Sequence, residues 1–260
     1  MVVSNLMKKT IEDMIAAGHR INGRGNDEFR VPTITTGIVH SANGSAMVDL
    51  GQTKVIIGIK PELKEPYPDR PNEGSMATMA ELSPMASPEY EPGPPDQSSV
   101  ELSRVVDRVV RESGMVDFKA LCIKEKEKVW NLAFDMYILD MDGNLFDACV
   151  MGIVASLKTG SLPVYDAEKD VADFSKSGGP YPLRDTPVGI TFAKIGDHIV
   201  VDPSVEEENV LDARLTIGVT EKDDVCAMQK GGQSGFTVEE VESLLPRAIE
   251  HARRIRGLYP

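Results

Sequence analysis

The sequence predicts an α+β fold in which mixed β-sheets are combined with a few amphipathic helices. Segments with an apolar side chain at every second residue recur along the chain, and most are joined by short turns. Helical segments with recognisable start signals separate them, in the order strands, helix, strands, helix, strands, helix. Because the strands-then-helix unit occurs twice, the pattern also suggests a structural duplication.

Four helices are expected, each marked by apolar residues at a spacing of three or four. Gly18 ends the first helix, and Asp142-Gly143 forms the turn before the third. The second and fourth open with the capping-box sequences Ser98-x-x-Glu101 and Thr237-x-x-Glu240. The predicted ranges are about 3–17, 98–113, 146–157 and 237–256.

The strands are predicted from apolar alternation and from turn residues. Asn43-Gly44 is a strong signal for a two-residue hairpin turn, and Gly196-Asp197 predicts another. The Pro- and Gly-rich stretch 61–97 is expected to be a loop with one strand near 76–82, and 160–186 is expected to be a loop. The remaining predicted strands are 34–40, 45–50, 55–59, 118–124, 129–141, 188–192, 199–201, 213–220 and 225–230.

Length, charge and cysteine usage restrict the class of protein. We expect the 260 residues to form a single domain over 1–260, with two pseudo-repeated halves at about 20–160 and 161–260. The net charge of −13 excludes indiscriminate nucleic-acid binding, so a polyanion must meet a local basic strip or a basic partner. No apolar run could span a bilayer and no secretory signal is visible. The three scattered cysteines favour a reducing cytosol and therefore a cytoplasmic protein.

Three patterns look like ligand motifs but fit them poorly. Asp140-x-Asp142-Gly143 has its glycine too early for a calcium loop, so a turn is expected. The glycine-rich run 231–235 lacks P-loop and dinucleotide spacing. Glu206-Glu207-Glu208 could supply half of a metal or acid–base site, but a solvated acidic turn is the more frequent explanation.

Three arginines on the second predicted helix are the strongest candidate for a binding surface. Arg104, Arg108 and Arg111 lie four and three residues apart and therefore share one side of the helix. Guanidinium groups form bidentate contacts to phosphate, so this row could hold a nucleic-acid backbone. The alternative is surface ion pairing within the helix, to Glu101, Asp107 and Glu112.

Several motifs spread over nearly the whole chain resemble the RNase PH superfamily, and within it the non-catalytic RNase PH-like subunits of archaeal exosomes. The family's Arg-x-Asp-Gly-Arg opening resembles Arg20-x-Asn22-Gly23-Arg24, and its Ala-Asp-Gly-Ser-Ala hairpin resembles residues 42–46. The segment 91–108, from Glu-Pro-Gly-Pro-Pro-Asp to Glu-Leu-Ser-Arg-Val-Val-Asp-Arg, resembles this subunit type most specifically. The resemblance implies an RNase PH-type fold.

Three parts of the catalytic pattern are missing. Catalytic members carry a paired arginine where this sequence has Gln97-Ser98, and a phosphate cradle of Gly-Ser-Arg type where it has 144–146, Asn-Leu-Phe. Leucine and phenylalanine side chains cannot donate hydrogen bonds to phosphate. The family's two catalytic aspartates correspond to Glu208 and Arg214, and arginine stays protonated and cannot exchange protons. Loss of catalysis is the single cause that explains all three.

The resemblance therefore implies a catalytically silent subunit with no cofactor of its own. It would alternate with a catalytic RNase PH-like exosome subunit in a hexameric ring, beneath RNA-binding cap subunits. The ring would degrade or tail RNA from its three-prime end, with phosphate and magnesium bound in the partner. This subunit would order the partner's active site and contact RNA through Arg104 and Arg108. Two alternatives stay open: an active phosphorolytic ribonuclease with Asp202, Glu208 or Asp212 as its acid, and a pure ring scaffold.

Overall fold

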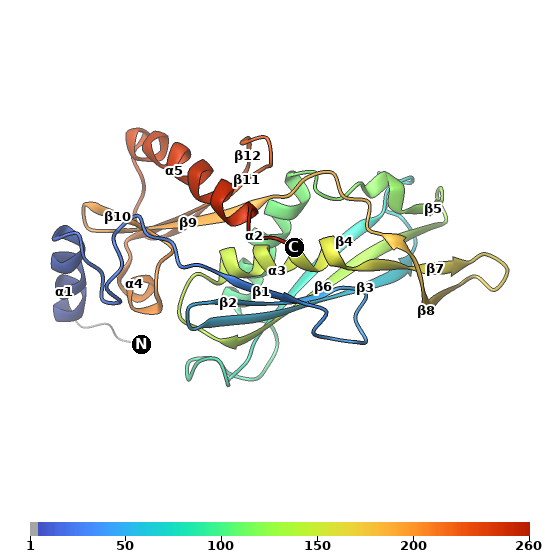
Figure 1. Cartoon of the computed structure of the whole chain (residues 1–260), viewed down its shortest axis with the longest axis horizontal. Coiled ribbons are helices and arrows are strands. Elements are labelled where there is room, and N and C mark those ends of the chain that lie inside the picture. Colours follow the sequence, from blue (N-terminus) through green and yellow to red (C-terminus); the bar gives the residue numbers. More distant parts are fainter. Residues whose placement is uncertain (1–4) are drawn as a thin grey trace.

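The computed structural model describes residues 5–260 and confirms the α+β fold with mixed sheets (Figure 1). The molecule is elongated, with helix α1 at one end and, at the other, a two-stranded hairpin of β7 (Ser161–Asp166) and β8 (Val171–Pro180) (Figure 1). The predicted first helix is confirmed from residue 5 onward, whereas residues 3 and 4 of that prediction lie outside the described residues. The helices are α1 Asn5–Ala16, α2 Gln97–Glu112, α3 Leu145–Thr159, α4 Val205–Val210 and α5 Val238–Arg256, with a 3₁₀ turn at Phe118–Leu121.

A six-stranded sheet forms the larger layer. Its order is β1-β2-β3-β6-β4, with the short β5 also paired to β6. All pairs are antiparallel except β4 with β6, which is parallel, so the sheet is mixed. The bounds are β1 Thr33–Thr36, β2 Ser45–Leu50, β3 Thr53–Lys64, β4 Ser75–Leu82, β5 Cys122–Lys124 and β6 Lys128–Asp140.

Helix α3 is the centre of the core. Its residues from Leu145 to Leu157 are all buried, so the helix is enclosed on every side. It packs on β2 and β3 of the large sheet and on β9 of the second sheet. Gly152 permits this close approach, since a Cβ there would collide with the Ile57 side chain.

A four-stranded antiparallel sheet forms the second layer, in the order β10-β9-β11-β12. Helix α5 packs on β9 and β11, and its predicted Thr237–Glu240 capping box is confirmed. None of the helices within residues 5–260 is both long and apolar enough to span a bilayer. The bounds of the strands of this sheet are β9 Val188–Ile195, β10 His198–Val201, β11 Ala213–Val219 and β12 Val225–Gly232.

Several local predictions are wrong. The strand predicted at 34–40 ends at Thr36, and residues 37–44 form a loop instead of a two-residue Asn43-Gly44 turn. This loop continues the pairing of β2 with β3, because Asn43 N–H donates to Ile59 O and Ile59 N–H donates to Gly44 O. Residues 160–186 are not simply a loop, since they hold the β7–β8 hairpin. Residues 118–121 form a 3₁₀ turn rather than a strand, and 206–208 belong to helix α4, where Glu207 is buried.

Candidate nucleic-acid interface

Helix α2 turns an apolar stripe to the core and a row of arginines to the outside. The buried stripe includes Leu102, Val105, Val106 and Val109. The Asp96 carboxylate caps the helix by accepting a hydrogen bond from the Ser99 N–H at 2.8 Å. The predicted Ser98–Glu101 capping box is therefore wrong, because an acceptor two residues earlier already serves the first turn.

The three arginines have different partners. Arg111 pairs with Asp107, with 2.8 Å between Nη2 and Oδ1, as the ion-pair alternative predicts. Arg108 donates to the Gln229 side-chain oxygen at 3.0 Å, across to β12. Arg104 is exposed and, among residues 5–260, makes no ion pair or hydrogen bond. The ion-pair alternative thus describes only Arg111 of the three.

Both predicted RNA-binding residues open onto one hollow between α2 and β4. Its volume is about 440 Å³. Arg104, Arg108 and Arg111 outnumber the two acidic groups there, so the hollow is locally cationic in an acidic chain. The lining residues are Met76, Ala77, Thr78, Ser103, Arg104, Asp107, Arg108, Arg111 and Glu112. Helical spacing in the sequence places the three arginines on one side of α2. The tertiary structure alone shows that β4 lines the same hollow and that Gln229 contacts Arg108.

The N-terminus of α3, which corresponds to the family's phosphate cradle, is closed by the chain's own side chains. Asn144 stands before the helix with φ +55°, and its backbone N–H donates to Glu208 Oε1 at 2.9 Å. Its side-chain amide donates to Asp147 Oδ2 at 2.8 Å and to Asp202 Oδ1 at 2.7 Å. Helix N-termini attract anions, and here Glu208 supplies that anion internally.

An aromatic ring and a guanidinium group fill the rest of this end. Leu145 and Phe146 are buried, and the Arg214 guanidinium stacks 4.1 Å from the Phe146 ring centre. Arg214 also pairs with Glu101 at 2.6 Å. Phe146 is therefore covered by a guanidinium group of this same chain. Gln97 and Ser98 lie exposed in the first turn of α2 and bring no cation.

The acidic residues here have divergent pKa values. Burial raises the pKa of Glu208 to about 7, against the opposing effects of the Asn144 N–H and Arg214. Burial also raises the pKa of Asp147 to about 8. Burial acts on Asp202 in the same direction, but Arg30 and then Arg24 outweigh it and hold the pKa of Asp202 below its ordinary value. Asp212 lies elsewhere, paired with Lys8 at 2.5 Å.

The Arg-x-Asn-Gly-Arg opening has a structural role that the sequence did not reveal. Arg20 is buried, pairs with Glu207 and donates to the Val201 carbonyl. Arg24 and Arg30 pair with Asp202 at 2.6 and 2.7 Å. The segment therefore ties residues 20–30 to α4 and to the closed end of α3.

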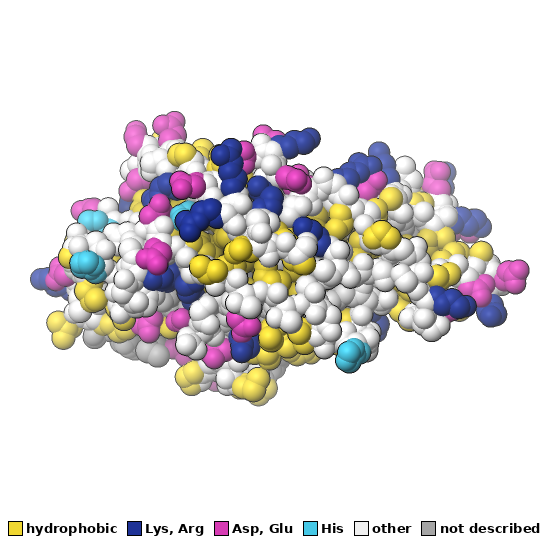
Figure 2. Space-filling view, in the orientation of Figure 1, with side chains coloured by type: hydrophobic (Ala, Val, Ile, Leu, Met, Phe, Trp, Pro, Cys, Tyr) yellow, Lys and Arg dark blue, Asp and Glu magenta, His cyan; other side chains and the backbone are white. Residues whose placement is uncertain are grey.

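The arginines of α5 are engaged differently from Arg104. Figure 2 shows basic and acidic side chains intermingled around this helix. Arg247 pairs with Asp27, Arg253 pairs with Asp223, and Arg256 donates to backbone carbonyls including that of Thr186. These three arginines are used within the chain.

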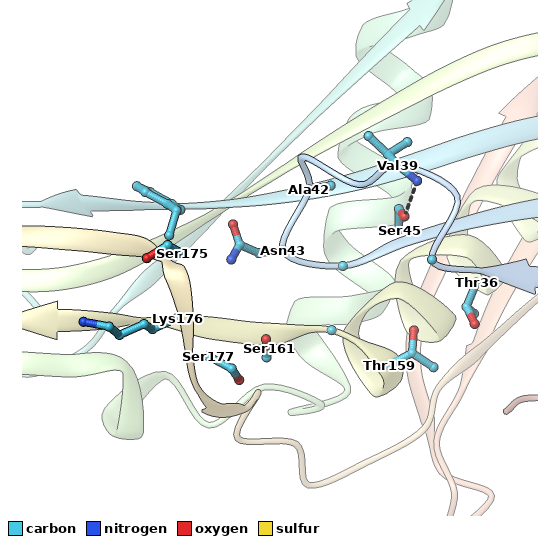
Figure 3. A pocket seen from close by; sticks show the side chains of 14 residues that line it. Thr36, Val39, Ala42, Asn43, Ser45, Thr159, Ser161, Ser175, Lys176 and Ser177 are labelled. Atoms are coloured by element: carbon cyan, nitrogen blue, oxygen red, sulfur yellow. Dashed lines mark hydrogen bonds between the residues drawn. The ribbon is translucent and has the colours of Figure 1, made fainter.

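A second hollow, of about 360 Å³, lies beside the C-terminal end of α3 (Figure 3). Hydroxyl and amide groups such as Thr159, Ser161 and Asn43 line it. Its one lysine, Lys176, pairs with Asp173 at 3.0 Å. Helix C-termini carry partial negative charge, so we assign no phosphate site there. Within residues 5–260 no three His, Cys, Asp or Glu side chains are grouped to hold a metal ion.

Comparison with known proteins agrees with the resemblance to the RNase PH superfamily over nearly the whole chain. Residues 28–163 match the model of the 3′ exoribonuclease family, domain 1, and residues 185–250 match domain 2. The chain is 48% identical to "Exosome complex component Rrp42" of Methanothermobacter thermautotrophicus, covering 96% of this chain and 92% of that protein. It is 43% identical to the protein of that name from Methanopyrus kandleri, covering 98% and 96%.

Solved structures with this fold include archaeal exosomes. A chain of the structure titled "archaeoglobus fulgidus exosome with RNA bound to the active site" matches with a TM-score of 0.91 and 42% identity, covering 98% of both chains. A chain of the structure titled "Archaeal exosome core" matches with a TM-score of 0.86 and 39% identity, covering 98% and 96%. The resemblance noted in the sequence is thereby confirmed, and the chain belongs to the 3′ exoribonuclease (RNase PH) family.

Proposed function

We propose that this chain is a non-catalytic component of an archaeal exosome ring that acts in three-prime to five-prime phosphorolytic RNA degradation. It would alternate with a catalytic RNase PH-like subunit in a hexameric ring under RNA-binding caps, in the cytoplasm. The names of its relatives, high identity over nearly the whole chain, and the exosome structures that it matches support this assignment.

The closed end of α3 carries the proposal that the chain itself is silent. Phosphorolysis needs hydrogen-bond donors aimed at phosphate. Here the Asn144 N–H is already bound to Glu208, and Phe146 is stacked under Arg214. A phosphate ion would have to displace a carboxylate from a closed site. Phosphate and magnesium are therefore assigned to the partner's active site and no cofactor to this chain.

One observation favours the alternative of an active ribonuclease. The Glu208 pKa of about 7 is the value expected of a general acid at neutral pH. However, the Glu208 carboxylate accepts a backbone hydrogen bond, and the neighbouring cradle positions hold no donor side chain. We therefore favour the silent subunit.

The RNA contact is proposed for Arg104 and Arg108. They share a cationic hollow, and Arg104 has no partner within residues 5–260, so no ion pair must be broken before it binds phosphate. Both are expected to neutralise phosphates rather than read bases, which suits degradation of RNA without sequence preference.

A phosphorolysis assay tests catalytic silence. The folded chain is incubated alone, and then with its RNase PH-like partner, with labelled oligo-adenylate RNA, phosphate and magnesium. We expect no nucleoside diphosphate from the chain alone and a higher rate from the mixture than from the partner alone. Release of diphosphate by the chain alone would contradict the proposal and restore Glu208 as a candidate acid.

Charge reversal tests the RNA contact. Arg104→Glu in an assembled ring should weaken RNA retention, whereas Arg254→Glu, at an exposed arginine of α5, serves as the control. Gel filtration verifies that both variants still form rings. Unchanged retention by the Arg104→Glu ring would support the pure scaffold instead.

A further inference from the structure

A carboxylate one helical turn from Arg104 is bound elsewhere. Glu101 precedes Arg104 by three residues in α2, a spacing at which opposite charges pair on the surface of a helix. The Glu101 carboxylate instead accepts a hydrogen bond from the Arg214 guanidinium of β11, with 2.6 Å between Nη2 and Oε1. Arg104 is exposed and, within residues 5–260, is left without an ion pair.

The second carboxylate within one turn of Arg104 is also occupied. Asp107 pairs with Arg111 at 2.8 Å and accepts a hydrogen bond from the Thr78 hydroxyl at 3.3 Å. The positions four residues away on either side carry no carboxylate. Arg104 therefore stays unpaired within α2 only as long as Glu101 and Asp107 keep their present partners.

Arg214 is a preorganised partner for Glu101. Its side chain is only 15% exposed, and its guanidinium lies 4.1 Å from the Phe146 ring centre. The strand register places Gly231 of β12 opposite Arg214, and a Cβ at Gly231 would lie 2.7 Å from Nη2. Because the guanidinium already packs against a ring and a glycine, it loses little freedom on binding Glu101. A pair between Glu101 and the exposed Arg104 would have to order a mobile side chain.

We propose that Arg214 is a positioning residue for the RNA contact: it holds the Glu101 carboxylate and thereby leaves the Arg104 guanidinium free for an RNA phosphate. The inference rests on the RNA contact proposed above and adds a residue that affects RNA only through another. Without Arg214, the Glu101 carboxylate pairs with Arg104, and a phosphate must break that pair before it binds. Gly231 belongs to the same arrangement, because it leaves room for the Arg214 guanidinium.

RNA binding by assembled rings tests the capture of Glu101. Arg214→Met removes the cation and keeps an unbranched side chain against the Phe146 ring. We expect the dissociation constant for labelled oligo-adenylate RNA, measured by fluorescence anisotropy, to rise about two-fold, because a helical ion pair then competes with the phosphate. Glu101→Gln should bind RNA at least as tightly as the wild type, and the double variant should recover wild-type affinity.

The signs of these effects separate positioning from a purely mechanical link between α2 and β11. If the ion pair only tied the helix to the strand, Arg214→Met and Glu101→Gln would weaken RNA binding equally and the double variant would not recover. That result, or an unchanged dissociation constant for Arg214→Met, overturns the inference. An Arg104→Ala ring is measured beside them. Weaker binding by that ring alone means that only the inference fails, whereas wild-type affinity removes the proposed RNA contact and the inference with it.

Gly231→Ala tests the same step with both charges in place. Its Cβ would displace the Arg214 guanidinium from Glu101, so RNA binding should weaken in the same direction as in Arg214→Met. Gly235→Ala is the matched control, because a Cβ there would have open space around it. Thermal unfolding verifies the fold of all variants, and Gly231→Ala replaces Arg214→Met if the latter does not fold. Equal RNA affinity of the two alanine rings overturns the role of Gly231 and, in that case, the whole inference.

Discussion

Helices α2 and α3 are neighbours in one core, yet the groups of α3 that could bind an anion are paired inside the chain, whereas those of α2 are in part unpaired. The N-terminus of α3 is closed by Glu208, Asn144 and the stacked Arg214–Phe146 pair, so its donors are used inside the chain. The outer surface of α2 leaves Arg104 unpaired among the described residues. A helix terminus binds an external anion only if no internal group has taken its place. The N-terminus of α3 is therefore already occupied by a carboxylate of this chain, whereas the outer surface of α2 is available to an external anion.

The largest expected effect comes from breaking the buried pair behind the closed end. Arg20→Ala leaves Glu207 buried without its cation and orphans the Val201 carbonyl. Breaking a buried pair costs about 3–5 kcal/mol, and we expect that loss in the free energy of unfolding measured with urea. Arg70→Ala, at an exposed loop arginine, should change it by less than about 1 kcal/mol. A similarly small effect for Arg20→Ala would show that the network does not hold the closed end.

The second prediction concerns the pH dependence of the closed end. The folded-state pKa of Glu208, about 7, lies above the ordinary value of 4.5. Its contribution to stability is therefore fully present below about pH 4.5 and is lost as the pH rises through about 7. The slope from one such group is at most about 1.4 kcal/mol per pH unit.

Glu208→Gln should reduce the loss of stability with rising pH without abolishing it. The glutamine oxygen can still accept from the Asn144 N–H, and Asp147, with a pKa of about 8, still contributes up to that pH. Thermal unfolding of wild type and variant at pH 5, 6 and 7 measures the difference. Parallel curves would mean that Glu208 titrates normally and is not enclosed.

The sequence predicted most of the fold because its signals are local. Alternation in 129–141 and the capping box at Thr237 depend on neighbours in the chain, and both appear where expected. The prediction of a two-residue turn at Asn43-Gly44 was wrong because hydrogen bonds to Ile59, which is distant in sequence, decide the path of that loop. The β7–β8 hairpin was not predicted because its strands pair irregularly and do not alternate regularly between apolar and polar side chains.

The candidate site was predicted only in part, for the same reason. Helical spacing placed Arg104 and Arg108 on one surface, and residue chemistry marked Phe146 as unable to bind phosphate. Nothing local indicated that Glu208 reaches the Asn144 N–H, 64 residues away in sequence. Similarly, only the fold reveals that Glu101 serves Arg214 rather than a neighbouring arginine of its own helix.

The third prediction separates Arg104 from Arg108 by salt dependence. Each phosphate neutralised on single-stranded nucleic acid contributes about 0.7 to the slope of log K against log salt concentration. Arg104→Ala in the assembled ring should lower the slope by about this amount. Arg108→Ala should lower it less, because Arg108 already donates to Gln229. Fluorescence anisotropy with labelled RNA at several salt concentrations measures both, and identical slopes for all rings would exclude a direct phosphate contact.

The smallest effect is expected at Arg111, which shares the hollow but has a partner. Its pair with Asp107 is an exposed contact one helical turn away, and such pairs contribute about 0.3–0.5 kcal/mol. Arg111→Ala should therefore lower the free energy of unfolding by less than about 0.5 kcal/mol. It should also leave the salt slope of RNA binding unchanged, because the Asp107 carboxylate already neutralises the guanidinium. A slope as low as that of the Arg104→Ala ring would mean that RNA displaces Asp107, so that the phosphate-binding surface extends over all three arginines.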